Sequence, residues 1–280
     1  MKILVIPSSL NDLKHDVDGF IIGIKNFATY GLCIDDLSIL NKLKNKEIFI
    51  NINKNMHNCD LEKLKDILLS LNNYNIKGVM YYDIAVLQLY KSLNLNYDLV
   101  WSCEHYTTNY ETINYFLEYG VNYTYLSSDI TASEVNEIRH NTNCKLILNL
   151  FGYLPMFVSK RHIVKNYLDY FNLDDNSKIN YMEKEGCIYP IIDNNIGTQV
   201  YSCNILNGIK YYDIDVDYIV LNSFNIDESK FKAVLDMFKS VNSKNVDKYY
   251  LDINRMFDNT DLGFLEKNTI YRVKKNEKES

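Results

Sequence analysis

Eight short apolar runs alternate along this chain with segments of helical periodicity. Each run is nearly continuous in apolar residues, which is typical of parallel strands that are buried on both faces. The runs begin at residues 2, 19, 47, 76, 98, 123, 145 and 217. Strands that alternate with helices predict an α/β fold, and eight such units predict a (β/α)8 barrel of the TIM type. The same pattern also allows a doubly wound open sheet.

The segments between the runs carry helix signals. Residues 59–73 have leucines and an isoleucine at helical spacing behind Asp60, a favoured N-cap residue. Thr131 and Glu134 have the spacing of a capping box. Gly120 follows another amphipathic segment, where a glycine commonly terminates a helix. These signals support the alternation of strands and helices.

One region interrupts the alternation. Residues 172–202 are first polar and then form two short β-like runs around the turn sequence DNNIG, which predicts a hairpin. We therefore expect a barrel over residues 1–244, with residues 172–202 inserted as a small β-hairpin before the last strand. Residues 245–280 then form a C-terminal extension that ends in a basic tail.

Composition narrows the functional classes. The 280 residues carry a net charge of −6, so nucleic-acid binding would require a local basic patch. No stretch reaches the roughly 20 apolar residues of a membrane span, and we expect no membrane partner. The six cysteines are scattered, without a C-x-x-C pair. Reduced thiols in a cytoplasmic protein are the expectation.

Polar residues at the ends of barrel strands are candidates for chemistry, because functional groups collect at the carboxyl-terminal face. Glu104 and Asp129 end adjacent predicted strands, and paired carboxylates can divide acid and base roles. We therefore take both as catalytic candidates. The alternative is that each caps the following helix or pairs with Lys25 or Lys54.

A hydroxyl and two cations follow the seventh run. Ser159, Lys160 and Arg161 stand where the next helix begins, and free N–H groups there favour an anion. The alternative is a solvated basic face that includes Lys165. The sequence has no H-E-x-x-H, no G-x-S-x-G, no Cys/His catalytic signature and no glycine-rich phosphate loop. It therefore offers no standard hydrolase motif.

At these residues the chain resembles the collagenase-like peptidases of family U32. The similar segments occur in order along most of the chain, and no single one is decisive. They are DGFIIGIKNF, EIFININKNMHN, VWSCEHYTTNYETINYFLEYGV, YLSSDITASEVNEI, YPIIDNNIGTQVYS and NRMFDNTDLGFLEKNTIYRVKK.

The family signature, a Gly-x-x-Cys followed by a serine and a basic or glycine pair, is matched only in part. Gly152, Ser159, Lys160 and Arg161 fit it, but Pro155 stands at the signature cysteine. His162 stands at the next cysteine of many members. In some branches these cysteines help to bind an iron–sulfur cluster, so their loss argues against such a cluster here. Ser128 stands where the family commonly has arginine, which removes one anion contact.

The resemblance implies two kinds of activity. The family name implies proteolysis, yet several branches act in hydroxylation of RNA or of ubiquinone. MFVSKR resembles the branch that forms 5-hydroxyuridine at the tRNA wobble position. Members of that branch are thought to use prephenate and often work as paired paralogues.

That branch gives our leading expectation, tRNA wobble hydroxylation with tRNA and a paralogue as partners. Asn53, Glu104, Asn109 and Asp129 would line the pocket, and Lys160 with Arg161 would hold an anion. The alternatives are a collagenase-like peptidase and a non-catalytic partner subunit that lacks the cluster cysteines.

Overall fold

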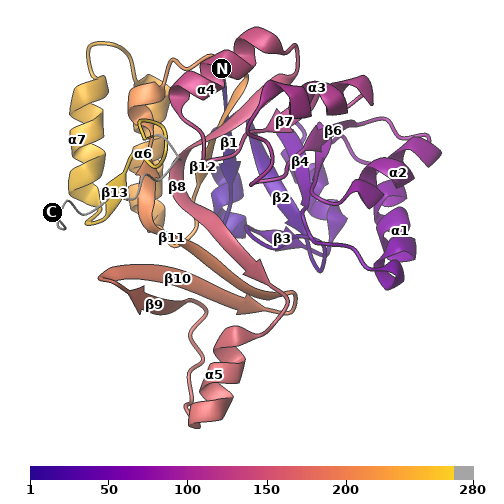
Figure 1. Ribbon diagram of the computed structural model, residues 1–280, viewed down its shortest axis with the longest axis horizontal. Coiled ribbons are helices and arrows are strands. Elements are labelled where there is room, and N and C mark those ends of the chain that lie inside the picture. Colours follow the sequence, from indigo (N-terminus) through magenta and orange to yellow (C-terminus); the bar gives the residue numbers. More distant parts are fainter. Residues whose placement is uncertain (268–280) are drawn as a thin grey trace, which may run out of the picture.

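A closed barrel of parallel strands forms the body of the protein in the computed structural model, which describes residues 1–267 (Figure 1). The final strand pairs in parallel with both the first strand and the seventh, and this double pairing closes the sheet. The predicted (β/α)8 barrel is thus confirmed, and the open-sheet alternative is excluded. The barrel strands are β1 (Lys2–Ile6), β2 (Gly19–Ile24), β4 (Glu47–Ile52), β5 (Gly78–Tyr81), β6 (Asp98–Trp101), β7 (Tyr123–Tyr125), β8 (Lys145–Ser159) and β12 (Tyr218–Asn222).

Helices cover the barrel less evenly than in an ideal TIM fold. The connections that follow β1 and β2 hold the short 3-10 helices η1 (Leu10–Lys14) and η2 (Leu37–Leu43) and the small strand β3 (Cys33–Ile34). α-Helices follow the next strands. These are α1 (Leu61–Leu71), α2 (Ile84–Ser92), α3 (Tyr110–Glu118) and α4 (Ala132–Asn141), with α6 (Glu228–Ser240) and α7 (Val246–Met256) after β12.

Local signals in the sequence explain most of these helix ends. Thr131 and Glu134 form the expected capping box at α4, and Gly120 has φ +85° directly after the C-cap of α3. Asp60 behaves differently, because its side chain does not cap α1. One of its oxygens accepts from the His57 N–H, and the other lies 2.8 Å from the Lys54 ammonium.

A second unit projects from the barrel, and we call it the arm (residues 155–201). Strand β8 does not end at the barrel rim but continues to Ser159, where it pairs antiparallel with β11 (Gly197–Asn207). Three further elements complete the arm: α5 (Ile163–Phe171), β9 (Asn180–Lys184) and β10 (Cys187–Asn194). Figure 1 shows β8 and β11 running together from the barrel into the arm, with α5 at its far end.

The hairpin predicted within residues 172–202 is present as β10 and β11, joined at the DNNIG turn. The arm also takes in α5, whereas the sequence places these residues in the barrel, before the insertion. None of the residues of α5 is buried. The short strand β13 (Thr260–Asp261) pairs with β11, while the basic tail beyond residue 267 lies outside the described residues.

Candidate functional site at the mouth of the barrel

A cavity of about 240 Å³ lies where the arm folds over the carboxyl-terminal mouth of the barrel. Its barrel side comes from residues that follow β2, β4, β5 and β6, as the rule for TIM barrels predicts. Its other side comes from the arm. The barrel side consists of Thr29, Asn53, Lys54, Asn55, Tyr82, Glu104 and His105, and the arm contributes Met156, Phe157, Val158, Lys160 and Ile196.

A second, smaller cavity of about 30 Å³ adjoins the first and shares Glu104 and His105 with it. Asp129 lines this smaller cavity, together with Pro155 of the arm. Glu104 and Asp129 therefore stand beside the same space, as the adjacent strands predicted. The Nδ1 atom of His105 lies 3.5 Å from Asp129 Oδ2, so the histidine faces the second carboxylate.

Glu104 is the most perturbed carboxyl at this site. Burial raises its pKa above the ordinary value, and the Asp129 carboxylate adds to this rise. Hydrogen bonding from the Tyr30 hydroxyl and the charge of His105 oppose the shift. A carboxyl with a raised pKa at a cavity wall is a candidate for proton transfer.

Buried tyrosines surround this carboxyl, and the sequence did not reveal them. Tyr30, Tyr125 and Tyr201 are each at most 5% exposed, and their pKa values are raised by burial first and by the Glu104 charge second. The Tyr125 hydroxyl donates to Asn149 Oδ1 at 2.6 Å. The raised pKa values keep the phenols protonated, and the Tyr30 hydroxyl donates to Glu104.

Two of the predicted binding residues line the larger cavity, namely Asn53 and Lys160. The Asn53 Oδ1 atom accepts from the Thr29 N–H at 2.8 Å, which fixes the amide. The Thr29 hydroxyl is buried without a hydrogen-bond partner among the described residues. A polar atom of this kind beside a cavity is available to a ligand or to water.

Other predicted binding residues lie elsewhere. Asn109 is the N-cap of α3, where its side chain accepts from the Thr112 N–H at 2.9 Å. Arg161 is exposed and does not line the cavity. Ser159 ends β8 and accepts from the Arg161 N–H. Gly152 lies in β8 at φ +110°, close to the backbone of Asn222, and so has a conformational role.

The anion expected at the start of α5 is supplied by the chain itself. Asp193 accepts from the Lys165 N–H at 3.1 Å and lies 2.9 Å from His162 Nδ1. The Ile163 N–H donates to the Thr198 hydroxyl at 2.8 Å. Side chains of the β10–β11 hairpin therefore accept hydrogen bonds from backbone N–H groups in the first turn of α5. The Lys160 side chain points toward the barrel and away from this turn.

The positions of the family cysteines do not fit a metal cluster. Pro155 lines the small cavity and has no ligand atom, and His162 pairs with Asp193. Within residues 1–267, no group of three or more histidine, cysteine or acidic side chains is arranged to hold a metal ion. In the same range, no helix is long and apolar enough to cross a bilayer.

These features define a (β/α)8-barrel protein whose candidate site lies at the mouth, between the barrel and an arm. The model of "Peptidase family U32" matches residues 30–179, and the chain belongs to this family. The solved structure of the U32 peptidase Mk0906 shares the fold, with a TM-score of 0.51 at 10% identity. The similarity covers 79% of this chain and 92% of that one.

Two curated relatives from Bacillus subtilis (strain 168) are also similar. The chain is 23% identical over 277 residues to "tRNA hydroxylation protein P2", covering 91% of this chain and 84% of the relative. It is 20% identical over 122 residues to "tRNA hydroxylation protein P1", covering 44% of this chain and 29% of that relative. The resemblance to family U32 is therefore confirmed.

Proposed function

We propose that this protein takes part in tRNA modification, in the formation of 5-hydroxyuridine at the wobble position. The observation that carries this proposal is its similarity to tRNA hydroxylation protein P2 over nearly the whole chain. We propose the mouth cavity as the site of this activity. It combines a half-buried carboxyl, two amides and two lysines with apolar side chains of the arm.

Each side of the cavity has a distinct chemical role in this proposal. Lys160 holds an anionic group, either an RNA phosphate or a carboxylate of a small co-substrate such as prephenate. Glu104 gives or accepts a proton at the cavity wall, where burial raises its pKa. Asn53 positions the reacting group by hydrogen bonding.

We further propose that the protein works without an iron–sulfur cluster at the family cysteine positions. The support is chemical, since cluster ligation requires thiolates or equivalent donors and Pro155 offers none. A paralogue with intact cysteines would then supply any redox step. This protein would form one half of such a pair, and its similarity to both P1 and P2 supports that arrangement.

A non-catalytic partner subunit is the second candidate, and the same loss of cysteines favours it. In that case the cavity would be structural, and the protein would act by stabilising an active paralogue. The two candidates differ in their requirement for Glu104 and Lys160. A catalytic subunit needs both side chains, whereas a scaffold needs only the fold.

The decisive experiment is nucleoside mass spectrometry of total tRNA from cells that lack this gene. Every strain keeps the paralogue that is the proposed partner, and any other paralogue that could replace this protein is deleted. Complementation uses the wild-type chain, the double variant K160A/R161A and E104Q. Loss of 5-hydroxyuridine that only the wild type restores supports a catalytic subunit.

Restoration by all three chains would assign the scaffold role instead. Unchanged 5-hydroxyuridine in the deletion strain would refute both candidates. It would direct attention to proteolysis, for which gelatin degradation by the wild type but not by E104Q is the test.

A further inference from the structure

An exposed apolar groove lies in the arm, between α5 and β9, away from the mouth cavity. Its volume is about 920 Å³. Several large apolar side chains of the groove are exposed by 41% or more: Ile163, Tyr167, Leu173, Tyr181 and Met182. A concentration of exposed apolar side chains on one unit is typical of a protein interaction site.

The helix on one side of the groove, α5, packs against β10 and β11 but leaves most of its apolar side chains exposed. None of the residues of α5 is buried, although its sequence is strongly amphipathic. Tyr167 and Phe171 contact each other, with ring centroids 4.7 Å apart, and Tyr170 is 79% exposed. A helix normally buries its apolar stripe against another element. The exposed part of this stripe is therefore expected to be covered by something other than the described residues.

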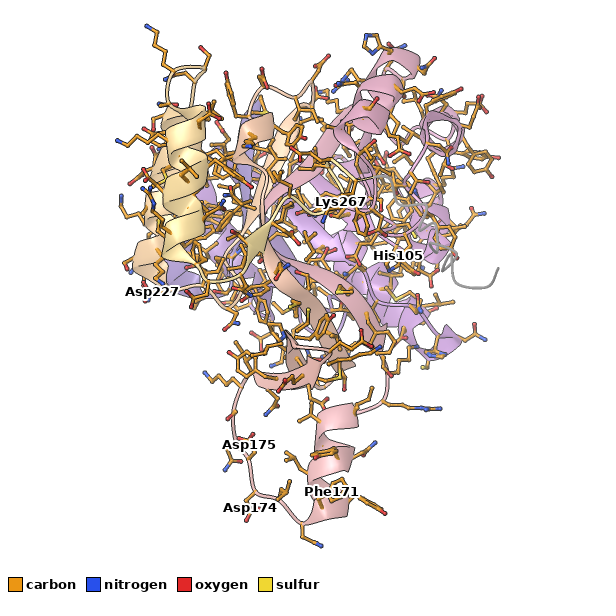
Figure 2. The ribbon with its side chains drawn as sticks, turned by 60° about the vertical axis from the view of Figure 1, so that its left-hand side comes forward. His105, Phe171, Asp174, Asp175, Asp227 and Lys267 are labelled. Atoms are coloured by element: carbon orange, nitrogen blue, oxygen red, sulfur yellow. The ribbon has the colours of Figure 1, made fainter. Side chains whose placement is uncertain are left out.

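The charge of the side chains that line the groove indicates which kind of partner it can bind. Three carboxylate residues line it, Asp174, Asp175 and Glu183, and no lysine or arginine does. Asp175 already accepts hydrogen bonds from Ser177 and Asn180. Asp174 and Glu183 have no ion-pair partner within residues 1–267. Figure 2 shows Phe171 on α5 and both aspartates on the loop after it, far from the barrel.

We propose that this groove binds a segment of another protein that combines large apolar side chains with flanking lysines or arginines. Helix-in-groove recognition uses apolar anchors at i, i+3, i+4 and i+7, and the groove between α5 and β9 presents the complementary apolar surface. The carboxylates select cationic flanks by electrostatic complementarity. This inference does not depend on the proposed tRNA function.

The same charges argue against three other occupants. A second copy would bring like carboxylates together across a two-fold axis, and this chain already has a net charge of −6. RNA presents a row of phosphates, which the carboxylates repel. An anionic membrane surface is repelled in the same way.

The test uses two fluorescent peptides with the same apolar heptad pattern, one carrying lysines and the other glutamates at the remaining positions. Anisotropy titration against the full chain measures both dissociation constants at low and high salt. We expect micromolar binding of the lysine peptide, weakened several-fold by salt. The glutamate peptide should bind at least ~10-fold more weakly.

Variants locate the binding to the groove. Tyr167→Ala should weaken the lysine peptide ~10-fold, because large aromatic anchors dominate such interfaces. The pair D174N/E183Q should weaken it several-fold and reduce its salt dependence. The matched controls are Leu251→Ala on α7 and the pair E62Q/D66N on α1, all exposed and remote. Circular dichroism melting confirms that every variant is folded.

Four outcomes would overturn the proposal. Equal binding of both peptides would show that the groove does not select by charge. No binding of either peptide would show that the groove is not a binding site for such a segment. Self-association that Tyr167→Ala abolishes in sedimentation velocity would assign the groove to a second copy. Direct binding of tRNA or of anionic vesicles to the chain, if Tyr167→Ala abolishes it, would assign the groove to a polyanion.

Discussion

The Nζ atom of Lys160 in the arm is in hydrogen-bond contact with Nε2 of His57, in the loop between β4 and α1. The same ammonium lies 3.5 Å from the backbone oxygen of Asn55. The contact therefore joins the arm to the rim of the barrel beside the mouth cavity. Arg161, the next residue, remains exposed and outside that cavity.

Because the two cations differ in position, their single variants should differ in effect. We expect K160A to lower 5-hydroxyuridine in tRNA by ~10-fold or more, since a hydrogen bond to a charged group contributes roughly 1.5–3 kcal/mol. We expect R161A to stay within ~3-fold of the wild type, because its guanidinium does not face the site. Nucleoside mass spectrometry of complemented cells measures both. Equal losses from the two variants would contradict the assigned positions.

Glu104 should make the stability of the protein depend on pH in a defined direction. Burial raises its folded-state pKa above the ordinary value of 4.5, so the folded chain holds the proton more tightly than the unfolded chain. The stabilisation from the protonated form is complete below that ordinary value and is lost as pH rises through the folded pKa. E104Q removes the buried charge, so it should melt above the wild type at pH 8.

The difference in melting temperature should shrink as the pH is lowered toward 4, because the wild-type carboxyl then becomes neutral as well. Thermal melts across this range provide the measurement. Glu137→Gln, an exposed change on α4, is the control and should show no such trend. If E104Q is less stable than the wild type at every pH, the charged carboxylate stabilises the fold.

Asn109 should behave as a helix cap and not as a ligand. Its side chain accepts the Thr112 N–H, so N109A should lower the free energy of unfolding by about 1 kcal/mol. N109D keeps the acceptor and should stay near the wild type. Urea unfolding measures both variants. Neither should change the 5-hydroxyuridine content of tRNA, and a large loss with N109A at unchanged stability would restore Asn109 to the binding site.

The barrel could be predicted from the sequence because each of its strands is a local apolar run. Leu4, Ile50 and Val220 lie in these runs and are fully buried in the paired strands. The continuous hydrophobicity of the runs therefore identified the strands. Glu104 and Asp129 could be placed together for the same reason, since adjacent parallel strands end at one edge. The shared cavity follows from topology alone.

Only the hairpin of the arm could be predicted, because the rest of its geometry depends on pairing between distant residues. Strand β8 passes Pro155 without ending, since an irregular register opposite Tyr201 accommodates the missing N–H. That continuation carries Phe157 and Lys160 over the mouth. The occupancy of the α5 N-terminus by Asp193 also depends on a residue 31 positions beyond His162. No local pattern in the sequence indicates either relationship.

Gly152 supplies the last prediction, which separates a conformational role from a binding role. It has φ +110°, and a Cβ atom there would lie 2.4 Å from the backbone oxygen of Asn222. Both the left-handed backbone and the collision oppose a side chain, so G152A should destabilise the fold by roughly 2–5 kcal/mol. Urea unfolding measures the change in the free energy of unfolding. If G152A gives no soluble protein, the destabilisation exceeds the total stability of the fold.

Gly120→Ala is the matched control, because Gly120 also has a positive φ but has nothing within 4 Å of its Cβ position. It should cost only the backbone strain of roughly 1–2 kcal/mol. The excess cost at Gly152 then measures the close approach of β8 to β12, where the barrel strand bends toward the arm. If both alanine substitutions lower the free energy of unfolding equally, β8 and β12 do not approach closely at this point. Gly152 would then again be a candidate residue of the binding site.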